Sequence, residues 1–297
     1  MRTARRFFSL AALALPLFLS GCFFFRRIRH LPIPAPPSTV LTVTPEELVA
    51  QLNQRWDAFK SLTATVDIQT TQFKTEQGVE KEYTTFRANI LMQKPGMLRV
   101  YGRVPVIGTE MFDMASNGEN FTLYIPHYEK AYEGPDTLTK KSPSMLENLR
   151  PGFFYDAMVV RGIPSDDFYS VTSDSETVED VKRKNLLMIP EYILNITQPL
   201  SGSRQLTPVR VITFHRGDLL PYEQDLYDSQ GNEETIVTYA NYQAYGFGPY
   251  PQMITIKRPL EGFQLDIAIE KVTENINLNN DQFVVKVPSG TKIQQLE

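Results

Sequence analysis

The chain has 297 residues, of which 42% are hydrophobic and 22% are charged, a composition typical of a globular protein with one large domain or two small ones. Its single cysteine excludes an internal disulfide framework and Cys-rich zinc or iron–sulfur sites. Its three histidines share no ligand spacing, and a formal net charge of −4 argues against a nucleic-acid-binding protein. We therefore expect no metal, no cofactor and no nucleic-acid partner.

The N-terminus has the pattern of a lipoprotein signal. Three arginines among the first six residues precede an apolar stretch at 7–19, which is too short for a comfortable membrane span. The stretch ends in LSGC, which is similar to the bacterial lipobox, where a diacylglycerol is attached to the cysteine. The sequence thus predicts a signal peptide at residues 1–21 and acylation of Cys22 with fatty acids such as palmitate. An ordinary signal peptide with an incidental cysteine, or an uncleaved anchor, is the alternative.

The segment that follows is predicted to be a tether. Residues 22–43 contain four prolines between 32 and 37 and little that could pack, which favours an extended polyproline conformation. Several acyl chains on one cysteine anchor firmly, and three nearby arginines either contact anionic headgroups or form a solvated charge run. By resemblance to enterobacterial sorting signals, Phe23 permits export to the outer membrane. We expect a lipid-anchored protein of the bacterial envelope that faces the periplasm.

One folded domain is expected over residues 44–297, and it opens with a helix. Thr44 and Glu47 form a capping box around Pro45, which suits the first helical position. Apolar residues then recur at helical spacing through Glu46 to Lys60. The pattern predicts an amphipathic helix that packs on a core.

After this helix the apolar period changes to two, which indicates β-strands. The sequence predicts successive strands joined by tight turns, because apolar and polar residues alternate and Gly and Pro residues separate the alternating stretches. Asn117 and Gly118 form an Asn-Gly pair, which is a type I′ hairpin signal. The expected strands are Leu62 to Gln69, Phe86 to Met92, Leu98 to Arg103, Met111 to Ala115, Phe121 to Ile125 and Phe263 to Glu270. They imply an antiparallel meander with one buried face.

An apolar insertion interrupts the meander. Ser142 to Ser144 can start a second helix that carries Met145 and Leu149 and that Pro151-Gly152 ends. The apolar segment Phe153 to Val159 follows, and a helix is one conformation that we consider for it. We expect this insertion to cover the concave face of a curved sheet.

Three motifs in this order resemble the LolA/LolB superfamily of periplasmic lipoprotein carriers and receptors. They are KPGMLRV at 94–100, DMASNG at 113–118 before an aromatic strand, and DQFVVKVPSG at 281–290. Together with the first helix they cover about residues 44–134 and 263–290. The segment from Tyr169 to Gly248 is longer than a minimal carrier of this family needs, and its role stays open.

The resemblance implies a mainly β fold of the α+β class: a curved, unclosed antiparallel β-barrel with amphipathic helices forming a lid over an apolar cavity. The cavity would take acyl chains of lipids or lipoproteins. Candidate cavity and lid residues, each of which could also be plain core, are Leu52, Trp56, Val66, Ile68, Phe86, Ile90, Met92, Met145, Leu149, Phe153 and Phe154. By rough position in the family, Val104, Val106 and Ile107 are candidates for a membrane-contacting loop, although an ordinary strand edge explains them better.

We found no catalytic motif in the sequence. It has no G-x-S-x-G elbow, P-loop, H-E-x-x-H or G-x-G-x-x-G. An acidic stretch between Asp166 and Asp180 is interpreted as a solvated loop rather than a weak calcium site. We expect a monomeric, non-enzymatic protein that takes part in lipoprotein sorting or lipid transfer, working with a periplasmic carrier. The alternative is a stress-sensing or protein-interaction module with the same fold.

Overall fold

The computed structural model describes residues 40–74, 78–103, 108–136, 150–180, 184–200 and 202–296. By their contacts the residues form two units. The larger unit comprises Pro37–Glu176 and Ile189–Glu297, and the smaller comprises Met1–Pro36 and Thr177–Met188. In the smaller unit the structure describes only the ends of two strands, so the account below concerns the larger one.

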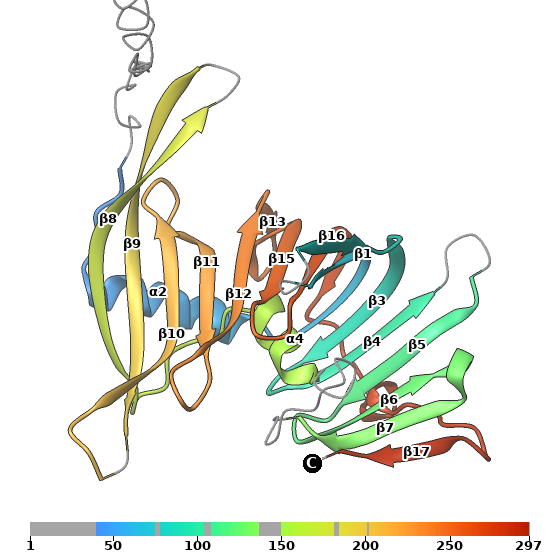
Figure 1. Ribbon diagram of the computed structural model, residues 1–297. Helices are drawn as coiled ribbons and strands as arrows, with labels where there is room; N and C mark the ends of the chain where they lie inside the picture. Colours follow the sequence, from blue (N-terminus) through green and yellow to red (C-terminus); the bar gives the residue numbers. More distant parts are fainter. Residues whose placement is uncertain are drawn as a thin grey trace, which may run out of the picture. The chain divides into compact units, whose positions relative to one another are not determined.

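A single open sheet carries most of the described chain, with the order β17-β7-β6-β5-β4-β3-β1-β16-β15-β12-β11-β10-β9-β8 and β2 paired beside β1 (Figure 1). Its first eight strands in the chain are β1 (Ser61–Lys74), β2 (Val79–Glu82), β3 (Phe86–Gln93), β4 (Met97–Arg103), β5 (Glu110–Ser116), β6 (Asn120–Ile125), β7 (Lys130–Pro135) and β8 (Phe168–Asp180). The others are β9 (Asn185–Pro199), β10 (Leu206–His215), β11 (Leu220–Tyr227), β12 (Glu233–Ala240), β15 (Met253–Arg258), β16 (Phe263–Glu274) and β17 (Lys292–Gln295). A separate hairpin joins β13 (Gln243–Tyr245) to β14 (Gly248–Tyr250).

The fold is mainly β, and the sheet is not closed into a barrel, as expected. Neighbouring strands are antiparallel, apart from β17, which runs parallel to β7. The predicted strands all lie inside β1, β3, β4, β5, β6 and β16. The stretch that the sequence left open, 169–248, forms β8 to β12 and extends the same sheet.

Helix α2 (Pro45–Ala58) begins as its sequence predicts. The Thr44 hydroxyl accepts from the Glu47 amide at 3.2 Å, and the Glu47 carboxylate accepts from the Thr44 amide at 2.8 Å. These bonds satisfy two amides that have no partner within the helix. Leu48 and Leu52 are buried, so this helix packs one face on the sheet.

Helix α4 (Pro151–Met158) contains most of the apolar segment Phe153 to Val159, and it begins at the Pro151-Gly152 pair that was expected to end the preceding helix. Pro151 occupies the first turn, where a missing N–H and a fixed φ favour a helix start. The predicted helix at 142–149, with Met145 and Leu149, lies outside the described residues. The described residues also form two short 3-10 helices, η3 (Pro126–Tyr128) and η4 (Asn280–Phe283).

The turn between β5 and β6 differs from the expected type. A type I′ turn needs positive φ at both central residues, but here only Gly118 has it, with φ of 94°. Asn117 instead accepts hydrogen bonds from the Glu119 and Asn120 amides through its side chain, at 3.0 and 2.9 Å. The hairpin forms as predicted, around a longer loop stabilised by an asparagine side chain.

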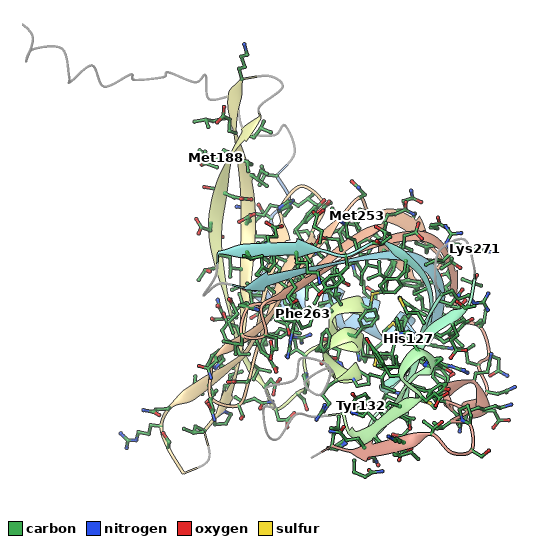
Figure 2. The ribbon with its side chains drawn as sticks, turned by 45° about the vertical axis from the view of Figure 1, so that its right-hand side comes forward. His127, Tyr132, Met188, Met253, Phe263 and Lys271 are labelled. Carbon is green, nitrogen blue, oxygen red and sulfur yellow. The ribbon has the colours of Figure 1, made fainter. Side chains whose placement is uncertain are left out.

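Apolar side chains gather on one face of the sheet, beneath the two α-helices. The larger cluster joins β1, β3, β4, β12, β15 and β16 to α4 and the end of α2. On β16, Phe263 lies beside α4 (Figure 2), where its ring centre is 6.3 Å from that of Phe153. A second cluster joins the first half of α2 to β9 and β10. The concave face and the helices over it therefore form the candidate functional site.

Candidate functional site

The predicted lining residues on the strands come together on the helix-covered face. Val66, Ile68, Ile90 and Met92 are 3% exposed or less and belong to the larger cluster. The pairing of β1 with β3 places Val66 opposite Ala88 and Leu62 opposite Met92. These side chains form one continuous apolar surface. Phe86 lies half-buried beside this cluster, with its ring 5.8 Å from that of Phe112.

Of the predicted lid residues, Trp56, Phe153 and Phe154 also contact the larger cluster. Leu52 lies in the second cluster instead, against β9 and β10, because it is one turn earlier on α2. Met145, Leu149, Val104, Val106, Ile107 and Cys22 lie outside the described residues. The roles of all these residues in binding stay predictions.

The helices fill the concave face closely. An apolar cavity of about 70 Å³ remains between α2, the end of α4 and the β13–β14 hairpin, lined by side chains that include Trp56, Met158 and Tyr242. Ligand pockets for drug-sized molecules span about 300–1,000 Å³. This cavity is therefore too small for an acyl chain unless a helix moves.

Aromatic side chains border the cavity, and those at residues 245–250 were not predicted from the sequence. The ring centre of Phe59, which follows α2, lies 6.0 Å from those of both Trp56 and Phe247. The ring centres of Phe247 and Tyr250 lie 5.6 Å apart. The side chain of Lys94 covers the Trp56 ring at 3.9 Å. No strand was predicted at residues 245–250, because a short, aromatic hairpin with two glycines shows no strand-like alternation.

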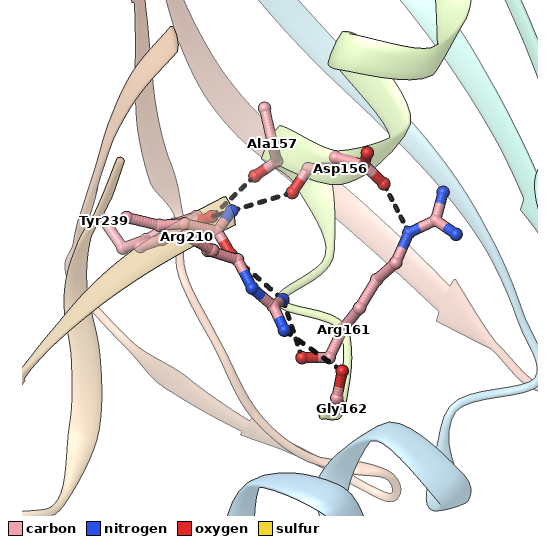
Figure 3. Close-up of polar contacts among 7 residues, drawn as sticks. Asp156, Ala157, Arg161, Gly162, Arg210 and Tyr239 are labelled. Atoms are coloured by element: carbon pink, nitrogen blue, oxygen red, sulfur yellow. Dashed lines mark hydrogen bonds and ion pairs between the residues drawn. The ribbon is translucent and has the colours of Figure 1, made fainter. Parts of the chain in front are cut away.

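Buried polar groups on the sheet (Figure 3) and on β14 hold the C-terminal end of α4. Gln224 donates to the Asp156 carbonyl at 3.0 Å, Tyr239 to the Ala157 carbonyl at 2.9 Å, and Tyr250 to the Met158 carbonyl at 3.0 Å. The last carbonyls of a helix have no partner within it, so these three donors satisfy groups that burial would otherwise penalise. We call Gln224, Tyr239 and Tyr250 the latch.

Arg210 extends this contact beyond the helix end. Its guanidinium donates to the Arg161 carbonyl at 2.8 Å and the Gly162 carbonyl at 3.0 Å, and Arg161 forms an ion pair with Asp156 (Figure 3). Burial lowers the pKa of Arg210, and the nearby Asp156 opposes that change. Burial also raises the pKa of Tyr239 well above its ordinary value, so its hydroxyl stays a neutral donor.

Comparisons with known proteins agree with this architecture. No protein-family model matches the sequence, and no curated protein matches it. A LolA superfamily protein from Nitrosomonas europaea has a similar structure, with a TM-score of 0.50 and 14% identity over 82% of this chain and 99% of that one. A DUF1329 family protein from Desulfovibrio piger has a TM-score of 0.52 and 14% identity over 80% and 95% of the two chains.

A Vibrio parahaemolyticus domain described as an outer membrane lipoprotein-sorting protein has a TM-score of 0.50 and 13% identity, over 80% of this chain and 94% of that one. At such identities the likeness concerns the fold. The chain has a LolA/LolB-like fold, which confirms the predicted resemblance. Over the described residues, none of the helices has the length and apolar character needed to cross a membrane.

Proposed function

We propose that this chain, with its LolA/LolB-like fold, is a lipid-anchored protein of the bacterial envelope that binds acyl chains between the concave sheet face and the helices. Its cargo would be lipoproteins or related lipids, which it would pass toward the outer membrane without catalysis. The observation that supports this most is a continuous apolar face across six strands, on which α4, the end of α2 and the β13–β14 hairpin pack among the described residues.

Binding requires α4 to move, because the cavity beneath it measures about 70 Å³. Moving α4 exposes the buried side chains of Phe154, Tyr155 and Met158 and breaks the latch. An acyl chain of sixteen carbons offers about 12 kcal/mol of gross transfer free energy, at about 0.8 kcal/mol for each buried methylene. This gain is of the same size as the cost, which comprises the exposure of three large side chains at about 1.5–3 kcal/mol each and the loss of three latch hydrogen bonds at about 0.5–1.5 kcal/mol each.

Lipid anchoring belongs to the same proposal. Acylation at Cys22, followed by an extended tether at 22–43, would keep the folded domain close to the membrane that supplies or receives cargo.

The test is cross-linking from the concave face. A photoreactive phenylalanine replaces Phe154 in cells fed a radiolabelled fatty acid, and we expect labelled lipid or lipoprotein to cross-link to the protein on irradiation. The matched control replaces Tyr101, an aromatic residue of β4 whose chain neighbours Val100 and Gly102 are the buried ones, so that it faces the opposite side. Equal labelling at both positions, or none at Phe154, would contradict the proposal.

A second candidate function follows from how closely the helices fill the concave face. If α4 stays closed, the sheet acts as a platform for a protein partner, and the extension β8 to β12 offers the additional surface. In that case the same experiment yields a protein adduct at outward-facing positions and no lipid at Phe154.

A further inference from the structure

Three neighbouring strands at one edge of the sheet bring two carboxylates and an imidazole together. Glu176 lies on β8, Glu191 on β9 and His215 on β10, and their ligand atoms all lie within 4.8 Å of one another. Glu191 and His215 are direct cross-strand partners, with His215 Nε2 3.4 Å from Glu191 Oε1.

The cluster faces away from the helices. Tyr192 and Phe214, which are the chain neighbours of Glu191 and His215, both point into the apolar cluster under α2. Side chains alternate along a strand, so Glu191 and His215 project from the opposite face. The cluster is therefore separate from the acyl-chain site proposed above.

Glu191 is a buried carboxylate without a hydrogen-bond donor among the described residues. It is 8% exposed, and its only ion-pair partner there is the His215 ring. The carboxylate of Glu176 lies within 4.8 Å of it. A buried carboxylate beside a second carboxylate is unfavourable unless a cation neutralises the pair.

His215 is positioned to offer a nitrogen lone pair. Its ring stacks on the Tyr222 ring with 3.5 Å between ring centres. The Tyr222 hydroxyl donates to the Asp218 carboxylate at 2.8 Å, and this bond holds the Tyr222 ring in place. A neutral imidazole ring is the form that binds metal ions.

We propose that Glu176, Glu191 and His215 bind one divalent transition-metal ion of the zinc class on the outer face of the sheet. Zinc binds imidazole nitrogen and carboxylate oxygen at about 2.0–2.2 Å, which sets ligand atoms about 3.4 Å apart in a tetrahedron. The pair of His215 and Glu191 already has that separation, and the exposed Glu176 side chain is free to close on it. Two carboxylates balance the charge of the ion, and a fourth position stays open.

The ion would connect β8, the last strand of the sheet, to its two neighbours. Hydrogen bonding on one side alone leaves an edge strand less firmly held than an inner strand, and a metal bridge across three strands compensates for this. The three ligands come from positions far apart in the sequence, so no spacing motif could have predicted them.

Metal binding by the full-length chain, purified in detergent without a histidine tag and stripped with a chelator, tests the proposal. Titration with Zn²⁺ alone, followed by calorimetry, is expected to give one saturable site per chain and a higher melting temperature. Co²⁺ should give the visible absorption bands of a tetrahedral nitrogen–oxygen site. We expect Glu191→Gln and His215→Ala each to weaken Zn²⁺ binding at least about tenfold.

His127→Ala is the matched control, because His127 lies on η3 and outside the cluster, and this variant should bind Zn²⁺ like the unaltered chain. Glu176→Gln, at an exposed position, serves where a buried variant fails to fold, and it too should lose affinity. The proposal is overturned if the unaltered chain shows no saturable site, or if Glu176→Gln binds Zn²⁺ as tightly as the unaltered chain does.

Discussion

Tyr239 connects the sheet to helix α4 through one hydroxyl group, which both donates to the Ala157 carbonyl and accepts from the Gln224 amide at 3.2 Å. Both partners are buried, so no water replaces a lost bond. A single oxygen atom at this position therefore satisfies two polar groups inside the core. The importance of the latch can be tested at this residue.

Replacing Tyr239 with Phe leaves the Ala157 carbonyl buried without a partner. We expect the free energy of unfolding to fall by about 1–3 kcal/mol, which is the usual cost of an unsatisfied buried polar group. Urea unfolding followed by circular dichroism measures it. Tyr101→Phe removes a hydroxyl that has no hydrogen bond among the described residues, and its unfolding midpoint should not change.

Asp225 gives the chain a pH-dependent stability. Burial, reinforced by Glu223 and Glu233, raises the pKa of Asp225 to about 7. In the unfolded chain an aspartate titrates near about 3.9, so between these values the folded chain holds a proton that the unfolded chain has released. The free energy of unfolding therefore decreases as the pH rises from about 4 to about 7.

Asp225→Asn removes this titration. We expect the melting temperature of the variant to exceed that of the unaltered chain by a margin that grows up to about pH 7 and is constant above it. Thermal unfolding between pH 5 and 8 checks this, with Glu82→Gln at an exposed position on β2 as control. A margin that is the same at pH 5 and pH 8 would contradict the assignment.

At the scale of elements, β17 lies parallel to β7 at the end of the sheet, and Gly134 makes that close approach possible. A Cβ atom built on Gly134 would stand 2.7 Å from the Leu296 carbonyl oxygen, which is backbone and cannot rotate away. Gly134 is therefore required for the position of β17.

Gly134→Ala should separate the end of β17 from β7 and lower the free energy of unfolding by about 1–3 kcal/mol, the usual cost of overpacking. Hydrogen exchange of the β17 amides, which we expect to accelerate in the variant, shows where the change occurs. Gly217→Ala is the control, because a Cβ there meets nothing within 4 Å. Unchanged exchange in β17 with lowered stability would place the effect elsewhere.

The elements predicted correctly are those whose signals are local. Thr44 and Glu47 define the start of α2 through bonds three residues apart, and alternation in β1 and β3 reports one buried face. The start of α4 at Pro151 was not predicted, because Pro-Gly marks both ends and beginnings of elements, and only packing on the sheet decides between them. The acidic stretch interpreted as a loop is largely strand β8, since charged residues on an edge strand read like a solvated segment.

At the scale of the molecule, the candidate site was partly predictable. Val66, Ile90 and Met92 follow from alternation, whereas the latch does not, because Gln224, Tyr239 and Tyr250 look like ordinary surface residues until the chain folds. The fold itself followed from the order of motifs in the first and last parts of the domain. The middle of the sheet was missed because no motif covers 169–248.

The register of the sheet has a consequence for how the chain acquires its structure. β1, the first strand, pairs along its length with β16, the last strand but one. β1 is therefore synthesised early, and its partner β16 is synthesised near the end of translation. Contacts of such high sequence separation slow folding. Until β16 emerges, the apolar row that includes Val66 and Ile68 has only β3 beside it. A chain that crosses a membrane N-terminus first would thus be exposed to aggregation for most of its passage, and holding chaperones would matter more for this protein than for one built from local hairpins.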